Sequence, residues 1–177
     1  MSAEHAVQDL LTKQAIHEVV LRYCRGVDRV DRDLIAAAFH PDANCEFGSL
    51  LLSGDTIADS IAEAAASNEI TTHMVGNALY DLHGSIAHGE TYYLSTSVVI
   101  GDQGKQLRMR AGRYVDQFEE RDGTWKIANR VVVQDWCRFS DLPDLPAGAL
   151  SFRPGEQGPG DPLYTLLNTD LGSRAAH

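Results

Sequence analysis

The spacing of apolar residues predicts helices in the first third of the chain. Between residues 8 and 27 they recur every three or four positions, which is typical of an amphipathic helix with one buried stripe. A second, short helix is predicted from Asp31, a favourable N-cap, to His40, because Pro41 disfavours helical backbone in the residue before it. The stripe of the first helix contains Leu10, Ala15, Ile16, Val19, Val20, Tyr23 and Val27.

A short strand and a third helix precede a change of period. Residues 43–48 alternate as a strand does, and residues 56–67 carry a helical stripe behind Asp55, a candidate N-cap. Four longer runs then alternate in the manner of β-strands, with turn signals between them. These runs are residues 71–84, 85–101, 105–121 and 124–139, and the turns are His83-Gly84, Asp102-Gln103-Gly104 and Arg121-Asp122-Gly123.

This order of elements predicts an α+β domain. Short connections between consecutive long strands indicate an antiparallel meander, and helices that precede the strands indicate a curved sheet wrapped around them. We expect one domain over residues 1–139. Residues 140–177 are rich in proline and glycine, and we expect a tail that packs on this domain or on a neighbouring subunit, with a short helix at residues 163–168.

Composition narrows the classes of function. The formal net charge is −10, so the phosphates of nucleic acid would be repelled. The three cysteines form no CxxC pair, which supports neither a disulfide framework nor a zinc site, and we assign no metal and no cofactor. The N-terminus lacks the pattern of a signal peptide, and no apolar stretch approaches the roughly 20 residues that span a bilayer. We therefore expect a cytoplasmic protein without a membrane partner.

Candidate chemistry lies where the first helix ends and the first long strand begins. Strand alternation places His73 and Asn77 on the same face as Val75, which we expect to point into the core. Asp28 is then a candidate partner for His73, because a carboxylate bonded to one imidazole nitrogen leaves the other free to take a proton. Tyr23 lies about 140° around the helix from Asp28, at ~100° per residue, and can border the same cavity. The alternatives are a capping or solvated Asp28 and a structural His73.

Four segments resemble the SnoaL-like branch of the nuclear transport factor 2-like superfamily. They are, in order, "IHEVVLRYCRGVDRVD", "FHPDANCEF", "THMVGN" and "RYVDQFEERDGTWKIANRVVVQDW", and the resemblance covers residues 8–139. It implies a cone-shaped α+β fold with a strongly curved, mostly antiparallel sheet. Members include bile-acid dehydratases, hexachlorocyclohexane dehydrochlorinase, scytalone dehydratase and polyketide cyclases, which implies a pocket for a small-molecule substrate.

The resemblance also implies roles for three residues. In the dehydrochlorinase, a "GVD" aspartate at the end of the first helix pairs with a histidine that opens the first long strand, and Asp28 and His73 match these positions. In the bile-acid dehydratase, a tyrosine five residues before the aspartate joins the pair, and Tyr23 matches it. The dehydrochlorinase has no such tyrosine, so Tyr23 indicates loss of an oxygen leaving group rather than of halide.

Other polar residues are weaker candidates for substrate binding. Arg130 and Trp136 share a strand face, and Arg130 is a candidate to orient an anionic or phenolic substrate, with a salt bridge to an acidic residue as the alternative. Asn77 and Cys24 are further candidates for the pocket wall. The strand at residues 105–121 carries three arginines, which we interpret as a solvated or intersubunit face: Arg108, Arg110 and Arg113.

We therefore expect a cofactor-independent lyase or dehydratase that acts on a small, apolar, cyclic or aromatic substrate. His73 would abstract a proton, Asp28 would orient His73, and Tyr23 would assist the leaving group. Two rivals stay open: an isomerase or polyketide-type cyclase that uses the same pocket, and a non-catalytic binding or accessory subunit. We also expect a homo-oligomer, a trimer or a dimer, that covers an apolar sheet face. Its candidate residues are Val98, Val99, Val131 and Val133.

Overall fold

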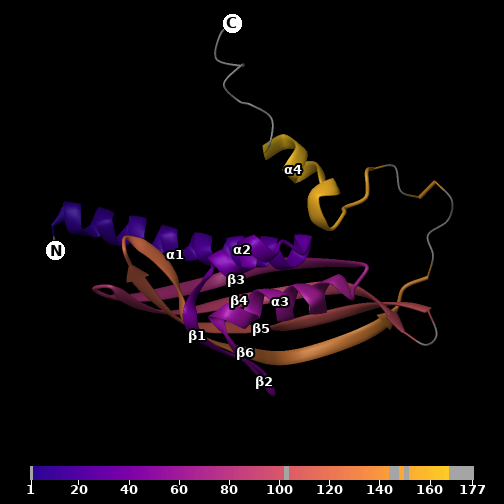
Figure 1. The fold of residues 1–177 in the computed structure, drawn as a ribbon, viewed down its shortest axis with the longest axis horizontal. Helices are drawn as coiled ribbons and strands as arrows, with labels where there is room; N and C mark the ends of the chain where they lie inside the picture. The colour runs from indigo at the N-terminus through magenta and orange to yellow at the C-terminus, as the bar shows by residue number, and fades with distance from the viewer. Residues whose placement is uncertain (1, 102–103, 144–147, 150–151, 168–177) are drawn as a thin grey trace, which may run out of the picture.

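A six-stranded sheet with helices along one face forms the molecule (Figure 1). The computed structural model describes residues 2–101, 104–143, 148–149 and 152–167. The helices are α1 (Ala3–Arg29), α2 (Arg32–Ala37), α3 (Gly54–Ala66) and α4 (Pro162–Leu167), with a 3-10 turn at Gly158–Gly160. The strands are β1 (Phe39–Phe47), β2 (Leu50–Ser53), β3 (Ile70–His83), β4 (Ile86–Gly101), β5 (Gly104–Arg121) and β6 (Thr124–Asp141).

The sheet has the strand order β2-β1-β6-β5-β4-β3. Strands β3 to β6 form an antiparallel meander, and only β1 runs parallel to its neighbour β6. Apolar side chains from the helices and from the sheet share one core, in which the fully buried residues include Ile16, Val20, Ile57, Phe118 and Ile127. The predicted α+β class with a curved, mostly antiparallel sheet is confirmed.

The first two helices differ in length from their predictions. Helix α1 begins at Ala3 rather than near residue 8, because Ser2 caps it and a polar segment extends it without an apolar stripe. Helix α2 ends at Ala37 rather than at His40. Phe39 already pairs with β6 in the parallel ladder, so tertiary pairing overrides the local helical pattern.

Close backbone approach fixes the positions of two helices. Ser53 is the N-cap of α3 in place of the predicted Asp55. A Cβ atom on Gly54, the first residue of α3, would meet a backbone carbonyl oxygen of β1 at 1.8 Å. In α1, a Cβ atom on Gly26 would meet the side chain of Ile35 at 2.9 Å. Gly26 therefore lets α2 pack directly against the end of α1.

Three β-bulges in the meander decide which side chains face the helices. The pairing of β3 with β4 shifts between Val75 and Ala78, and the pairing of β6 with β5 skips Ala128 and Asp135. An extra residue in one strand reverses the inward and outward alternation beyond it. Tyr80 is therefore buried, whereas Leu79, which simple alternation places in the core, is 75% exposed.

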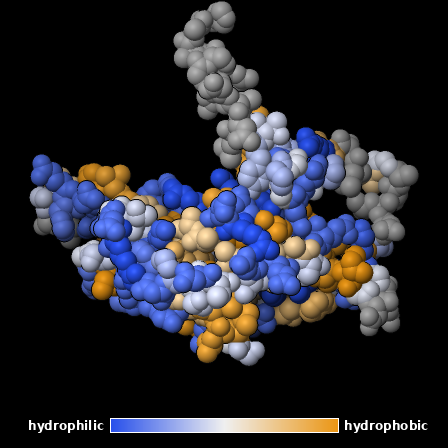
Figure 2. Space-filling view, viewed as in Figure 1, coloured by the Kyte–Doolittle hydropathy of each residue, from blue (hydrophilic) through white to orange (hydrophobic). Residues whose placement is uncertain are grey.

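The sheet face away from the helices is partly apolar. Its exposed apolar residues on four strands are Met74, Leu79, Tyr92, Val115, Val131 and Trp136. The register aligns Met74, Leu94, Ala111 and Trp136 in one row across this face. A second hydrophobic patch gathers where the β1–β2 hairpin projects (Figure 2), and β2 contributes the exposed Leu50 and Leu51.

The described part of the tail returns to the end of α1 (Figure 1). Tyr164 in α4 donates its hydroxyl to Asp31 Oδ2 at 2.7 Å, and Gln157 Nε2 donates to the Ala65 carbonyl at 3.3 Å. These contacts are to the tail's own domain, and its contact with a neighbouring subunit stays a prediction. The predicted turn at Asp102-Gln103 and Asn168 of the predicted last helix lie outside the described residues.

Candidate active site

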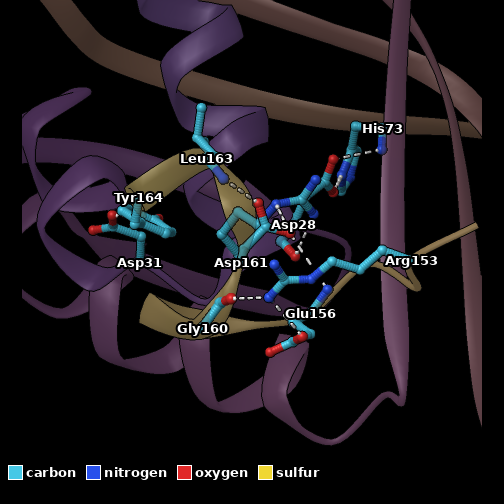
Figure 3. A network of polar contacts seen from close by, with 10 residues as sticks. Asp28, Asp31, His73, Arg153, Glu156, Gly160, Asp161, Leu163 and Tyr164 are labelled. Atoms are coloured by element: carbon cyan, nitrogen blue, oxygen red, sulfur yellow. Dashed lines mark hydrogen bonds and ion pairs between the residues drawn. The ribbon is translucent and has the colours of Figure 1, made fainter. Parts of the chain in front are cut away.

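Asp28 and His73 lie in contact where α1 ends against β3 (Figure 3). His73 Nδ1 is 2.6 Å from Asp28 Oδ1, and the backbone N–H of His73 donates to Asp28 Oδ2 at 2.9 Å. One carboxylate therefore holds both the ring and the backbone of the histidine. With Nδ1–H donated to Asp28, Nε2 is the nitrogen left to accept a proton, and no described residue hydrogen-bonds to it.

The end of α1 is shaped by a residue in an uncommon conformation. Val30 adopts the left-handed region with φ 55°, which costs a β-branched residue about 1–2 kcal/mol. Its N–H bonds to the Val27 carbonyl, and the next N–H, of Asp31, bonds to the Gly26 carbonyl at 2.8 Å. The chain therefore turns sharply two residues after Asp28, which leaves that carboxylate at the helix end facing β3.

A cavity of about 280 Å³ opens beside this pair. Tyr23 and His73 line it, and its apolar wall consists of Val27, Phe47, Ile61 and Val132. This volume is near the lower end of the range for small-molecule sites, which start at about 300 Å³. The cavity therefore suits a compact organic ligand.

Beneath the cavity lies a layer of aromatic rings around a buried ion pair. Arg130 donates from Nε and Nη2 to the two carboxylate oxygens of Asp116, at 2.7 Å each. The guanidinium carbon lies 4.5 Å from the ring centre of Tyr23 and 4.2 Å from that of Tyr114. The two rings pack edge to face, so the ion pair supports the wall that Tyr23 presents to the cavity.

Burial keeps Tyr23, Tyr114 and Cys24 in their neutral forms. It raises the pKa of Tyr23 and of Tyr114 above their ordinary value, although the charge of Arg130 opposes the shift. Burial likewise raises the pKa of the Cys24 thiol to about 12. Burial acts to lower the pKa of Arg130, but Asp116 outweighs it and holds that pKa above the ordinary value. Tyr23 is therefore a hydrogen-bond donor at neutral pH, and Cys24 is no nucleophile.

Four predicted substrate-binding residues do not line this cavity. Arg130 is fully buried in its ion pair, which is the alternative that the sequence left open, and Cys24 is buried in the core. Asn77 and Trp136 are exposed. Asn77 lies within the bulge of β3 and Trp136 directly follows the bulge at Asp135, so the simple alternation on which both predictions depended does not hold there. None of these four residues belongs to the wall of the cavity beside Asp28 and His73, and their contact with a substrate stays a prediction.

The cavity is lined instead by polar residues that the sequence did not single out. Arg108 and Arg110 face into it from β5, whereas Arg113 is on the opposite face and pairs with Glu90 at 2.7 Å. Ser95, from β4, also lines the cavity, and its hydroxyl is buried without a hydrogen-bond partner. The alternation of β5 places the two arginines on the inner face, because residues 108 and 110 are separated by even numbers of residues from the buried residues 114 and 118.

The tail lies beside the Asp28–His73 pair (Figure 3). Asp161 accepts hydrogen bonds from the backbone N–H groups of Leu163 and Glu156 and is 3.4 Å from Arg29 Nε. Gln157 donates to the carbonyl oxygens of two residues on the cavity wall, at 3.3 Å each, Ala65 and Asn68. The tail therefore packs against two residues of the cavity wall, and none of its described residues lines the cavity itself.

The described residues contain neither a metal cluster nor a membrane-spanning helix. No cluster of three or more His, Cys, Asp or Glu side chains with the arrangement of a metal site occurs among them. In the same part of the chain, no helix is both long and apolar enough to cross a membrane.

The sequence model of the SnoaL-like domain family matches residues 8–131. No curated protein sequence matches the chain significantly. The matched segment includes most of α1, all of α2, α3 and β3, and the first part of β6, and so contains Tyr23, Asp28 and His73.

Solved structures with the same fold include proteins named for elimination reactions. A hexachlorocyclohexane dehydrochlorinase of type 2 superimposes with a TM-score of 0.71 at 20% identity, covering 81% of this chain and 99% of that chain. A scytalone-dehydratase-like protein from Novosphingobium aromaticivorans gives 0.68 at 17% identity, covering 82% and 99%. A protein from the same organism that is similar to the beta subunit of an aromatic-ring-hydroxylating dioxygenase gives 0.59 at 21% identity, covering 73% and 93%.

Proposed function

Because this chain belongs to the SnoaL-like domain family, we propose that its cavity is the active site of a lyase that expels an oxygen leaving group, as a dehydratase does. One observation carries the proposal. The 2.6 Å contact between Asp28 and His73 stands at the wall of a ligand-sized cavity and leaves the second imidazole nitrogen free. This is the arrangement that a general base requires.

In the proposed reaction, His73 Nε2 removes a proton from a carbon of the substrate. The C–H electron pair ends in the new C=C bond, and the C–O bond to the leaving group breaks. The imidazolium that forms lies against the Asp28 carboxylate, which balances its charge and holds the ring in place. The imidazolium then gives its proton to the departing hydroxyl oxygen, which leaves as water, and His73 returns to its starting state.

Tyr23 assists this departure as a neutral donor. Its burial raises its pKa, so the phenol keeps its proton while the leaving oxygen develops negative charge. The Arg130–Asp116 pair contributes indirectly, because it packs on the ring of Tyr23 without lining the cavity. Asp28 and Arg130 are thus positioning residues, and His73 and Tyr23 are the groups that touch the substrate.

The comparisons support this class of reaction and also one of its two rivals. Two of the structural relatives are named for elimination of hydrogen chloride or of water. The dioxygenase-like relative supports the accessory-subunit rival. Against that rival, an assembly subunit has no need of a hydrogen-bonded base in a cavity. An isomerase would use the same base and is distinguished by its product.

The test is a screen of small hydroxylated cyclic, aromatic and alkenyl compounds in D₂O. Loss of water is followed by mass spectrometry, and exchange of carbon-bound hydrogen is followed by NMR. We expect His73→Gln to abolish turnover and Asp28→Asn to lower kcat by about 10²–10⁴-fold, the range of general-base catalysis, with KM nearly unchanged. Exchange without loss of water would replace the lyase with an isomerase.

His88→Gln is the matched control, since His88 is an exposed histidine on β4. It should leave turnover unchanged. Turnover that survives in both His73→Gln and Asp28→Asn would refute the proposed mechanism.

We also propose that the apolar outer face of the sheet is covered by further copies of this chain. The exposed row at Met74 and Trp136, together with Val115 and Val131, presents apolar surface on four adjacent strands. Light scattering after size exclusion should give a dimer or trimer, and Met74→Asp should dissociate it. A wild-type monomer at micromolar concentration would refute this oligomer.

A further inference from the structure

Two guanidinium groups line the proposed active site close to its base. The register pairs His73 with Ser95 and Ser95 with Arg110, so these three residues form one row on the inner face of three adjacent strands. Arg108 stands in the next row on the same face, beside Thr71 and Ser97. Since adjacent strands are about 4.8 Å apart, a compact ligand can touch His73 and both arginines at once.

Neither guanidinium is neutralised by the described residues. Arg108 donates to the amide oxygen of Asn68 at 3.2 Å, and its Nε is buried without a partner. The guanidinium of Arg110 makes no hydrogen bond or ion pair with any part of the chain that the structure describes. Among the described residues, those that line the cavity include no aspartate and no glutamate.

Placing two like charges side by side in a partly buried cavity costs free energy. Burial and the neighbouring charge of Arg110 both lower the pKa of Arg108 from its ordinary value. An anion bound between the guanidiniums would remove this cost through charge-assisted hydrogen bonds, and arginine favours planar, bidentate recognition of carboxylates. The unpartnered hydroxyl of Ser95 offers a further donor between the arginines and His73.

We propose that the substrate is an organic carboxylate, and that Arg108 and Arg110 bind the carboxylate next to the carbon from which His73 removes its proton. This assignment rests on the proposed function, because it uses the same base and the same cavity. Ser95 is a specificity residue in this arrangement, and it donates to the carboxylate oxygen nearest His73.

The charges of the reaction explain why two arginines are needed. When His73 takes the proton from the carbon next to a carboxylate, the C–H electron pair moves onto the carboxylate group, which becomes a doubly charged enediolate. One arginine offsets the charge that the substrate brings, and the second offsets the charge that develops in the transition state. The electron pair then returns to form the C=C bond of an unsaturated acid as the β-hydroxyl leaves as water.

Calorimetric titration tests the anion site without turnover. The probes are three unsaturated carboxylates with their uncharged amides: trans-cinnamate with trans-cinnamamide, benzoate with benzamide, and crotonate with crotonamide. We expect at least one carboxylate to bind more than 10-fold tighter than its amide. Arg110→Gln and Arg108→Gln should each weaken that carboxylate by about 10- to 100-fold, as expected for charged hydrogen bonds, and leave the amide unchanged.

Arg113→Gln is the matched control, because it removes the same charge from the opposite face of the same strand. It should change the affinity for the carboxylate by no more than about twofold, since the charge of Arg113 lies on the other side of the sheet and is screened by solvent and salt. If no carboxylate is preferred over its amide, or if Arg113→Gln weakens binding as much as Arg110→Gln, the carboxylate assignment is overturned.

The two proposals fail in different ways. In one outcome, His73→Gln still prefers carboxylates, and the wild type catalyses neither elimination nor exchange on any hydroxy acid. This outcome would retain the anion site and reject the lyase. Elimination that depends on His73 but is equally fast in Arg108→Gln and Arg110→Gln would retain the lyase and reject the carboxylate.

Discussion

Arg130 and the Arg108–Arg110 pair project from neighbouring strands onto the same face of the sheet, yet their surroundings differ in kind. Arg130 meets both oxygens of Asp116, and three aromatic rings lie within 5.5 Å of its guanidinium carbon. Arg108 and Arg110 meet no carboxylate among the described residues and line an open cavity. The first site has its counter-charge as folded, although Arg130 Nη1 makes no hydrogen bond among the described residues, and the second lacks the anion that would neutralise it.

This difference separates structure from function within one layer of side chains. A buried charge that already has its counter-charge becomes strongly destabilising when that partner is removed, and its charge is not available to neutralise a ligand. A charge that is held in a cavity without a partner destabilises the free protein slightly and stabilises a complex with an anion. The largest effects of substitution on stability should therefore fall at Asp116 and Arg130, and the smallest at Arg110.

Asp116→Ala should have the largest effect on stability. It leaves the Arg130 guanidinium buried without a counter-charge, which costs about 3–5 kcal/mol. The free energy of unfolding in urea measures it. Asp135→Ala is the control, because its carboxylate is 44% exposed and lies 3.8 Å from Arg113. That change should cost no more than about 1 kcal/mol. Equal losses in the two variants would contradict the contrast between the sites.

Replacing both partners should recover much of that loss. In the double variant Asp116→Leu with Arg130→Met, no charge is left buried, and apolar replacements of ion pairs are often neutral or stabilising. We expect the free energy of unfolding of the double variant to exceed that of Asp116→Ala by at least about 2 kcal/mol. A double variant no more stable than the single one would show that the aromatic rings need the guanidinium itself.

Ser95→Ala should stabilise the protein by about 1 kcal/mol, because it removes a buried hydroxyl that has no partner. Under the proposed carboxylate binding it should also raise KM for a hydroxy acid. Ser97→Ala is the control on the same strand face, since the Ser97 hydroxyl lies 3.2 Å from Thr71 Oγ1. That variant should lose about 1 kcal/mol. Thermal unfolding of both variants without ligand shows whether each substitution stabilises or destabilises the protein.

Arg110→Gln should have the smallest effect on stability. It breaks no hydrogen bond or ion pair among the described residues and relieves repulsion with Arg108, so the free energy of unfolding should stay within about 0.5 kcal/mol of the wild type. Circular dichroism melts measure it in the absence of ligand. A loss above 2 kcal/mol would assign Arg110 to the structural group instead.

The sequence predicted well where side-chain period and burial agree. The stripe of α1 and the alternation of the long strands gave the fold, and the "GVD" ending pointed to the contact between Asp28 and His73 that the structure contains. Strict alternation fails at Asn77 and Trp136, because each position lies in or next to a bulge. Gly76, beside Asn77, is a residue type that often marks a bulge in a strand, whereas no residue next to Trp136 gives such a signal.

The sequence predicts the wrong surroundings for Arg108 and Arg110 for a different reason. Charged side chains are usually solvated, so a run of three arginines on one strand was interpreted as surface. The parity of the strand separates Arg108 and Arg110 from Arg113, but the sequence alone does not show which parity faces the cavity. That choice depends on the packing of α1 and α3 against the sheet, which is a tertiary property.

The bulge at Asp135 divides β6 into two sections for protein engineering. Before it, Arg130 and Val132 belong to the buried layer and the cavity wall; after it, the pairing places Cys137 beside Arg110 on the inner face. A library at Cys137 and Phe139 would alter the surroundings of the two unpaired arginines without touching the Arg130–Asp116 layer. Deleting Asp135 would exchange inner and outer residues along the rest of the strand, so directed evolution here should vary side chains and keep strand length fixed.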